Sequence, residues 1–175
     1  DNPSELIKYH EKEIFLLIPE LEKSMGFNQN NEWHIFDVYE HILHVIDGVP
    51  NNLALRLAAL FHDIGKPYGY KEDENKIGHF YNHWNKSNEI FLKFCNKFNI
   101  PDDLKNKVSK LIVYHDLNFS KLEQNELQKV LKLFSKEDIK LLFELKKSDL
   151  HAQVNKYHYL ISEYGIQEKN LLLLK

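Results

Sequence analysis

The sequence is poor in cysteine and arginine. Its one cysteine, Cys95, excludes a disulfide framework and a zinc site built from several thiolates, and it suits a reducing compartment. Arginine occurs once, at Arg56, although lysine and arginine together number 23. The 6 glycines and 5 prolines are too few for a chain dominated by loops. The net charge of −3 offers no overall basic surface for nucleic acid.

Long apolar runs are also missing. No stretch approaches the roughly 20 apolar residues that a membrane helix needs, and no basic-then-apolar leader opens the chain. We therefore expect a cytoplasmic protein with no membrane partner. The chain starts at Asp1 rather than Met, so we expect a trimmed chain or a piece of a longer protein. The 43% hydrophobic and 28% charged shares are those of a globular protein, and 175 residues suit about one domain.

The apolar spacing is helical almost throughout, and no strand pattern or internal repeat is present. It predicts helices over about 6–21 (bent at Pro19), 37–47, 53–63, 83–98, 101–114, 123–134 and 136–154. Residues 66–78 are predicted to be a loop, and one or two short helices with a stop at Gly165 are predicted to end the chain. The prediction is one all-α helical bundle. Its parts are an N-terminal helix and connection (1–31), a core with the site (32–154) and C-terminal helices (155–175).

Three helix starts carry capping signals. Asp37 with Glu40, and Ser135 with Asp138, have the spacing of capping boxes, and Asn52 can cap the helix that follows it. That helix reads LALRLAALF over 53–61 and is apolar nearly all round. We therefore expect it to be central and buried.

The strongest chemical signal is the dipeptide His62-Asp63 at the end of this apolar helix. A buried carboxylate is costly unless it has a partner, and a metal ion can supply one. The alternative is ordinary: Asp63 as a turn residue and His62 as a hydrogen-bonded core histidine. The dipeptide alone favours the ordinary interpretation, so the case for a metal depends on other residues.

Two other polar residues lie on apolar helix faces. His41 shares a face with Val38 and Ile42, and Asp149 falls in register with Leu142 on the buried stripe of its helix. A hydrogen-bonded core histidine and a salt bridge to lysine are the alternatives. Two imidazoles and two carboxylates together suit manganese, iron, cobalt, nickel, zinc or magnesium. The set is His41, His62, Asp63 and Asp149.

Two helix-terminal histidines can extend this set. His83 opens one predicted helix and His115 ends the next. Each alone is consistent with helix capping or with the helix dipole. Together they can supply a second metal ion or bind phosphate.

The chain resembles the HD-domain metal-dependent phosphohydrolases. The matching segments are DVYEHILHVID, RLAALFHDIGKP, HFYNHWNKS, VYHD and KKSDLHA, which lie between residues 32 and 152. HFYNHWNKS is similar to a segment of the HD domain in bacterial CCA-adding tRNA nucleotidyltransferases, with Asn82 where glycine is usual. GFNQ and His34 resemble the stretch that enters that domain. The nucleotidyltransferase head is absent, so the chain is expected to be a C-terminal piece or a free-standing relative.

The resemblance implies which residues bind the metal. His41, His62, Asp63 and Asp149 would be the core ligands, with one or two divalent ions as cofactor. His83 and His115 would hold a second ion or the substrate's phosphate. His83 is preferred to His79, because it occupies the family's Gly-His position, and His79 and His44 would then be structural.

A mechanism follows as a hypothesis. A divalent metal lowers the pKa of bound water towards about 7. Asp63 would orient the attacking water or take its proton, and Lys66 would stabilise a phosphoryl oxygen or remain a solvated loop lysine. Arg56 would bind phosphate, or form a structural pair with Asp37 or Glu40, which we favour. His34 would contact the substrate.

The predicted function is hydrolysis of phosphate esters of nucleotides or tRNA ends. The resemblance suggests 2′,3′-cyclic phosphodiesterase, nucleotidase or phosphatase activity, with a nucleotide or another phosphate ester as substrate and tRNA as a candidate partner. Two other classes stay open: a non-catalytic helical module that contacts tRNA, and a di-iron oxygenase of the HD type.

Overall fold

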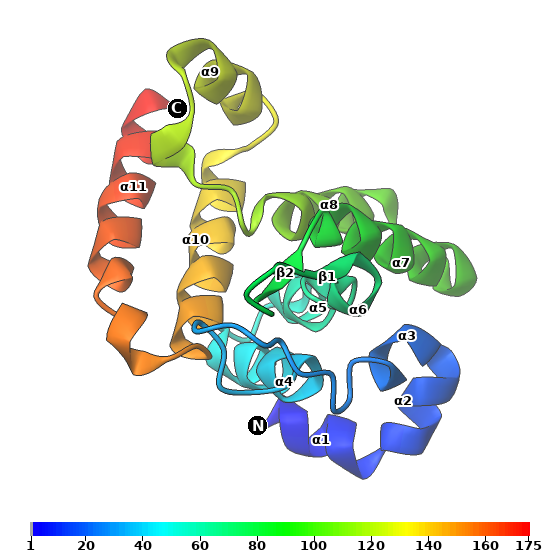
Figure 1. Ribbon diagram of the computed structural model, residues 1–175. Helices are drawn as coiled ribbons and strands as arrows, with labels where there is room; N and C mark the ends of the chain where they lie inside the picture. Colours follow the sequence, from blue (N-terminus) through cyan, green and yellow to red (C-terminus); the bar gives the residue numbers. More distant parts are fainter. Residues whose placement is uncertain (1) are drawn as a thin grey trace.

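The computed structural model describes residues 2–175 and has a buried helix at its centre (Figure 1). This helix, α5 (Leu53–Phe61), contacts three long helices that surround it. They are α4 (Val38–Gly48), α8 (Asp102–Tyr114) and α10 (Lys136–His151). Ala58, Ala59 and Phe61 of α5 have no exposed surface. The predicted central position of this helix is confirmed.

The remaining helices cover this core. Helix α7 packs along α8, α11 packs along α10, and α1 lies against α4. Figure 1 shows α10 and α11 side by side, with α9 beyond one end of α10. The bounds are α1 (Pro3–Tyr9), α2 (Glu11–Leu17), α3 (Pro19–Glu22), α7 (His83–Phe98), α9 (Gln124–Leu131) and α11 (Leu160–Leu174). Short 3₁₀ turns lie at η1 (Phe119–Lys121) and η2 (Asn155–Tyr157).

The all-α prediction is confirmed, but the loop predicted over 66–78 is wrong in part. It contains a short helix, α6 (Lys66–Gly69), and the first strand of a two-stranded antiparallel hairpin. The strands are β1 (Tyr70–Glu72) and β2 (Gly78–Phe80), with Lys71 opposite His79. Strands of three residues are too short to produce a recognisable alternation in the sequence.

Two helix boundaries also differ from prediction. The N-terminal segment is three short helices rather than one, because the chain breaks at His10 as well as before Pro19. The prediction that Gly165 ends a helix is wrong: α11 continues through it to Leu174. Glycine costs only about 1 kcal/mol in a helix interior, and burial of Leu171 at 4% exposure helps to keep α11 on the core.

The predicted caps at Asn52 and Ser135 are present, whereas the capping box predicted for Asp37 and Glu40 forms only in part, because the Glu40 carboxylate bonds to Lys8 instead. Asn52 accepts a hydrogen bond from the backbone N–H of Leu55, and Asp37 accepts one from Glu40. Ser135 and Asp138 form a reciprocal capping box at the start of α10. None of the helices in the described part of the chain is both long and apolar enough to cross a membrane.

Asp138 is expected to link stability to pH. Burial by itself would raise its pKa, but the hydrogen bonds from Lys110 and Ser135 lower it below the usual value. A carboxylate with a lowered native pKa stabilises the fold above its unfolded pKa of about 3.9, and this contribution is lost as the pH falls through the native pKa. Asp138→Asn should therefore cost about 1–2 kcal/mol of unfolding free energy at pH 7.

Urea unfolding from pH 7 down to pH 2 measures this effect. The difference between the wild type and Asp138→Asn should shrink as the pH falls below about 4. Glu137→Gln is the matched control, because Glu137 makes only a surface pair with Lys107 at 3.4 Å. A stability difference that stays constant across this pH range would contradict the prediction.

Candidate metal centre

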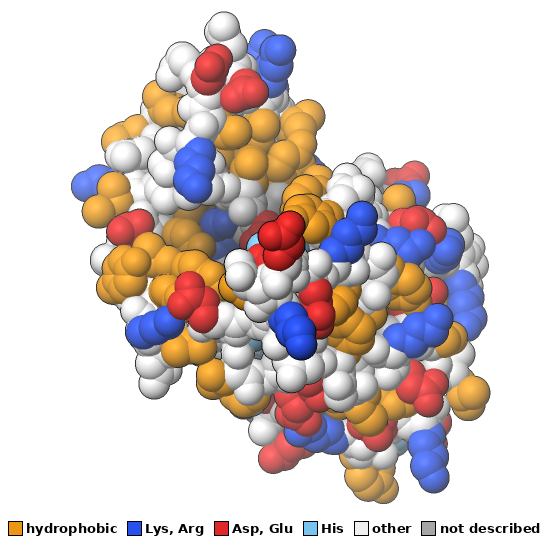
Figure 2. Space-filling view, in the orientation of Figure 1, with side chains coloured by type: hydrophobic (Ala, Val, Ile, Leu, Met, Phe, Trp, Pro, Cys, Tyr) orange, Lys and Arg blue, Asp and Glu red, His pale blue; other side chains and the backbone are white. Residues whose placement is uncertain are grey.

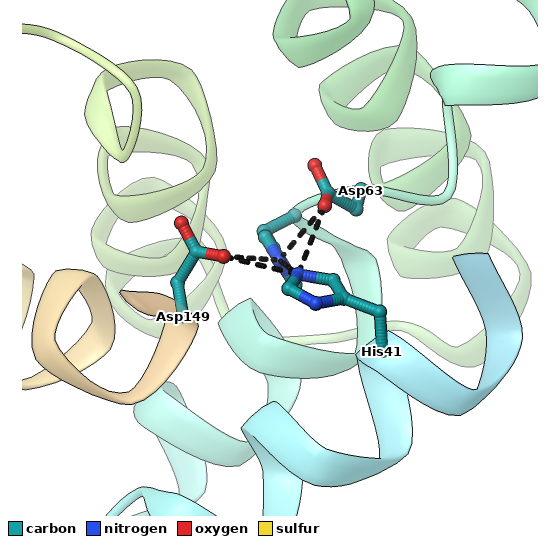
Figure 3. Close-up of side chains that lie close together, drawn as sticks. His41, Asp63 and Asp149 are labelled. Carbon is teal, nitrogen blue, oxygen red and sulfur yellow. Dashed lines mark hydrogen bonds and ion pairs between the residues drawn. The ribbon is translucent and has the colours of Figure 1, made fainter. Parts of the chain in front are cut away.

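His62 and Asp63 follow directly after α5, where the helix turns toward α6. Their side chains are 0% and 1% exposed. His41 comes from α4, also with no exposed surface, and Asp149 comes from the last turn of α10. Figure 3 shows Asp63 and Asp149 on either side of the His41 ring. Residues separated by more than 100 positions in the sequence therefore meet at one point.

The first group of ligand atoms is compact. The Nε2 atom of His41 lies 3.0 Å from an Asp149 oxygen and 3.2 Å from Oδ2 of Asp63. The Nε2 atom of His62 lies 3.3 Å from the same Asp63 oxygen. One ligand atom from each of these four residues lies within 4.8 Å of the others, which is close enough for a metal ion to contact all four.

A second group uses the other oxygen of Asp63. Oδ1 lies 3.2 Å from Nε2 of His83 at the start of α7, and 3.5 Å from Nε2 of His115 at the end of α8. His83 and His115 are 3% and 2% exposed. Oδ1 is buried and makes no hydrogen bond of good geometry. Asp63 thus presents one oxygen to each histidine pair, as a carboxylate that bridges two ions would.

Backbone carbonyls orient the histidine rings. Nδ1 of His62 bonds to the carbonyl of Ala59 at 2.8 Å, and Nδ1 of His83 to that of Phe80 at 2.9 Å. His115 bonds to Ile112 at 2.7 Å, and His41 makes a longer contact with Ala152 at 3.4 Å. A carbonyl can only accept, so each Nδ1 carries the hydrogen, and the neutral ring then leaves a lone pair on Nε2.

The four Nε2 lone pairs point at one another and at carboxylates. Nε2 of His41 lies 3.4 Å from Nε2 of His62, and the Nε2 atoms of His83 and His115 are also 3.4 Å apart. Acceptor groups held at this separation repel one another unless a cation or a proton lies between them. This set of nitrogen and oxygen ligand atoms therefore fits divalent metal ions.

The same crowding shifts the pKa values of the group. When no ion is bound, burial lowers the pKa of His41, but hydrogen bonds with Asp149 and Asp63 outweigh it and raise the value to about 9, so that a proton on Nε2 takes the place of the cation. Burial would raise the pKa of Asp63, yet the nearby His62 and Lys66 charges hold it well below its usual range. The pKa of Asp149 is likewise lowered, chiefly by the His41 hydrogen bond acting against burial. Both carboxylates are therefore ionised and available as ligands.

A cavity of about 420 Å³ opens beside these residues, and Figure 2 shows the hollow on this face of the molecule. Its polar wall includes Asp63, His83, His115 and Asp149. Its apolar wall includes Phe80, Leu150, Leu160 and Tyr164. The candidate metal ligands thus face a space that a small molecule can enter.

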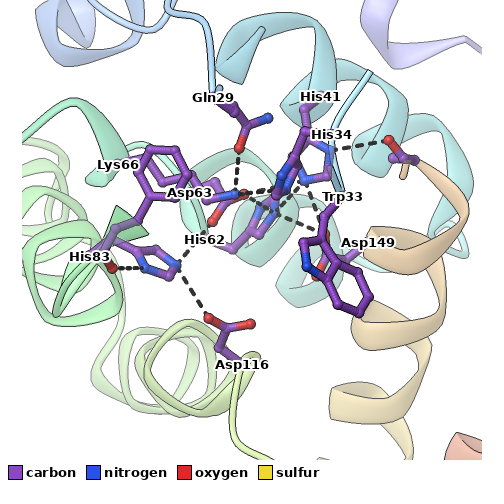
Figure 4. A network of polar contacts seen from close by, with 12 residues as sticks. Gln29, Trp33, His34, His41, His62, Asp63, Lys66, His83, Asp116 and Asp149 are labelled. Atoms are coloured by element: carbon purple, nitrogen blue, oxygen red, sulfur yellow. Dashed lines mark hydrogen bonds and ion pairs between the residues drawn. The ribbon is translucent and has the colours of Figure 1, made fainter. Parts of the chain in front are cut away.

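Lys66 is buried, with 5% exposure, and forms part of the cavity wall (Figure 4). Its Nζ atom lies 2.6 Å from Asp63, 2.8 Å from Gln29 and 3.2 Å from Nε2 of His34. Burial and the Lys66 charge lower the pKa of His34 to about 2, so this ring is neutral and accepts the lysine hydrogen. The three N–H groups of Lys66 therefore already have three acceptors, which favours a role in holding Asp63 over contact with phosphate.

Arg56 is not brought to the site. It lies on α5 but does not line the cavity, and its Nε atom is buried without a hydrogen-bond partner among the described residues. The favoured pairing with Asp37 or Glu40 is wrong: Asp37 accepts backbone hydrogen bonds, and Glu40 pairs with Lys8 at 3.0 Å. We have no physical account of the unpaired Nε atom.

Three residues that contribute to this region were not predicted from the sequence. Gln29, 1% exposed, holds Lys66. Asp116 lies 3.9 Å from Nε2 of His83 and lines the cavity, as does the buried Lys146. The segments VYHD and GFNQ contained Asp116 and Gln29. Lys146 lies one helical turn after Leu142 and one before Asp149, so its place on the apolar stripe was the available signal.

Comparison with known proteins gives a consistent result. The Multifunctional CCA protein of Shewanella frigidimarina is 29% identical over 129 residues, which are 71% of this chain and 30% of that protein. The Multifunctional CCA protein of Cupriavidus pinatubonensis is 32% identical over 91 residues, or 50% of this chain and 21% of that protein. That of Shewanella denitrificans is 26% identical over 127 residues, or 70% of this chain and 30% of that protein. The chain thus spans less than a third of these relatives.

The family match covers most of the candidate ligands. The HD domain matches residues 33–140, a range that includes five of the six residues assigned above and excludes only Asp149. The matched range is more than half of the 175 residues. Its helices are also the ones that converge on the histidine and aspartate cluster. On this match, and with this geometry, the chain belongs to the HD domain family.

Proposed function

We propose that the chain is a divalent-metal-dependent phosphohydrolase that cleaves phosphate esters of nucleotides or of RNA ends. The candidate reactions are those of a 2′,3′-cyclic phosphodiesterase, a nucleotidase or a phosphatase. One observation carries the proposal: four imidazoles, each with its Nδ1 hydrogen on a backbone carbonyl, direct Nε2 at a carboxylate that has one oxygen for each pair.

The arrangement divides into two groups of ligands. His41, His62, Asp63 and Asp149 would hold one ion, and Asp63, His83 and His115 would hold the other. Nitrogen and carboxylate ligands suit manganese, cobalt, nickel, iron or zinc, and carboxylates suit magnesium. When bound, such ions act as Lewis acids on phosphoryl oxygens and make water more acidic. The proposal has two ions because both oxygens of Asp63 have histidine partners.

The chain's own groups then have separate roles. Asp63, as the carboxylate shared by the two ligand groups, would orient the attacking water. Lys66 holds Asp63 in place through the 2.6 Å contact, with Gln29 and His34 as its other partners. This assigns His34 and Lys66 to positioning the bridging carboxylate, where the sequence had suggested contact with substrate.

The cavity supports a small phosphorylated substrate. Its volume of about 420 Å³ lies within the roughly 300–1,000 Å³ of small-molecule sites. Trp33 and Tyr164 line it, and aromatic rings of this kind can stack on a nucleobase. The net charge of −3 argues against tight binding of a whole tRNA by this chain alone.

Activity should depend wholly on a divalent ion. The stripped protein should release no phosphate from 2′,3′-cyclic nucleotides, 2′-, 3′- and 5′-nucleoside monophosphates or p-nitrophenyl phosphate. Adding back Mn²⁺, Co²⁺, Ni²⁺, Zn²⁺, Fe²⁺ or Mg²⁺ one at a time should restore hydrolysis of at least one of these substrates, and a chelator should remove it again. Each assay measures phosphate or the opened cyclic ester.

Two results would contradict the proposal. Metal-loaded protein that hydrolyses none of these substrates but retards tRNA in a gel would favour a non-catalytic tRNA-binding module. Iron-loaded protein that consumes dioxygen with a reductant, without releasing phosphate, would favour an oxygenase.

A further inference from the structure

Lys146 is a buried cation that the proposed chemistry does not use. It lies on α10, one turn before Asp149, and it is 3% exposed. Its side chain nevertheless lines the cavity, together with Asp116, Asp149 and Tyr164. A methionine or leucine would fill the same space without the cost of burying a charge. The ammonium group therefore calls for an explanation.

The contacts of Lys146 are with the backbone that follows α8. Its Nζ atom donates hydrogen bonds to the carbonyls of His115 and Leu117, the latter at 3.1 Å. The ring of Tyr164, from α11, lies 5.1 Å away. The last carbonyls of a helix lack partners within the helix and carry partial negative charge, so a cation is favoured there. Lys146 thus caps the C-terminal end of α8 from a neighbouring helix.

The capped residues include a candidate ligand of the second ion. His115 directs Nε2 at Oδ1 of Asp63, and Asp116, between the two bonded carbonyls, lies 3.9 Å from Nε2 of His83. The side chain of Asp116 is 56% exposed, and the turn is closed on one side by a hydrogen bond from the Leu117 N–H to the Tyr114 carbonyl at 3.1 Å. By holding the carbonyls on both sides of Asp116, Lys146 fixes the direction of the turn.

We infer that Lys146 is a positioning residue that holds His115 and Asp116 toward Asp63 and so determines the affinity of the second ion. The inference rests on the proposed metal-dependent function. It extends that function to a residue outside the matched family range of 33–140. Lys146 also links the two groups of ligands, because Asp149 of the first group lies one turn further along the same helix.

The test is a titration of metal-free protein with Co²⁺. Calorimetry and the visible absorption of the bound ion monitor the binding. Wild-type protein should take up two equivalents. Lys146→Met keeps the bulk of the side chain and removes its hydrogen bonds. This substitution should lower the affinity for the second equivalent of Co²⁺ by about 10-fold or more, as loss of a group that orients a metal ligand does. The affinity for the first equivalent should stay within about twofold of the wild-type value.

Lys147→Met is the matched control. Lys147 is the next residue of α10, and its Nζ atom pairs with Glu144 and Glu168 at 3.2 and 2.8 Å, away from the cavity. Lys147→Met should leave the affinities for both equivalents of Co²⁺ unchanged. Lys146→Arg retains donors for the two carbonyls and should bind the second equivalent more tightly than Lys146→Met. If Lys146→Met does not fold, Lys146→Gln, which keeps one amide donor, replaces it in the same comparison.

Metal-free protein supplies a second measurement. The imidazole signals of His115 in NMR spectra should shift or broaden in Lys146→Met, while those of His41 stay in place. Unchanged His115 signals, an unchanged second equivalent, or equal weakening of both equivalents would overturn the inference. A wild-type protein that binds no divalent ion would refute the proposed function, and the metal-free His115 signals would then decide the role of Lys146 independently.

Discussion

Asp63→Ala should abolish phosphate-ester hydrolysis, with a loss of at least about 10³-fold, or roughly 4 kcal/mol of activation free energy. The reason is that Asp63 contributes an oxygen to each of the two ligand groups, at 3.2 Å from His41 and 3.2 Å from His83. Its removal should therefore release both ions, where loss of any single histidine would weaken mainly one.

Metal analysis and circular dichroism accompany the assay of Asp63→Ala. Bound metal should fall from two equivalents to below one, while the helical signal stays near that of the wild type, because the residue follows the end of α5. Asp102→Ala is the control: this aspartate is 81% exposed and pairs only with Lys105. An Asp63→Ala protein that keeps full metal content and activity would refute the bridging role.

The second large effect is expected at Gly65, which lies between α5 and α6 and packs against the first turns of α7. A Cβ atom on Gly65 would lie 2.4 Å from the carbonyl oxygen of His83 and 2.6 Å from the backbone nitrogen of Ser87. Both atoms belong to the backbone of α7, so the helix would have to move. Overpacking of this kind costs about 1–3 kcal/mol. The displaced helix is the one that carries His83, so Gly65→Ala should also weaken the second ion.

Thermal unfolding measures this prediction. A loss of about 1–3 kcal/mol in a chain of this size should lower Tm by about 2–12 °C. Gly165→Ala is the matched control, because nothing lies within 4 Å of the Cβ position in the middle of α11. Alanine is the better helix former, so the control should be neutral or slightly more stable. A Tm for Gly65→Ala equal to that of the control would show that α7 is not held as closely as described.

The helices were predictable because their signals are local. Apolar residues repeat at helical spacing over 53–61 and 136–151, and caps such as Asn52 and Ser135 bond to backbone groups three residues away. Prediction from local signals was wrong where the signal is weak or where packing opposes it. The hairpin strands are three residues long, and the helix-breaking tendency of Gly165 is smaller than the packing of α11 on α10.

The six candidate ligands were also within reach of the sequence. His62-Asp63 ends an apolar helix, Asp149 lies on an apolar stripe, and the order of the other histidines matches a known family. Their chemical types and their helical faces are properties of short segments. The structure places their ligand atoms within 4.8 Å of one another in each group, and metal binding by these groups is the prediction that metal analysis tests.

The contacts that each charged side chain of the site makes were decided by long-range packing. Which oxygen of Asp63 meets which histidine, and whether Lys66 is free or already bonded to Gln29 and Asp63, follow from how four helices and a loop meet. Lys146 and Lys147 are adjacent in the sequence, yet α10 directs one toward the end of α8 and the other toward α11. Helical periodicity places a side chain on a face, but only the neighbouring helix decides what that face contacts.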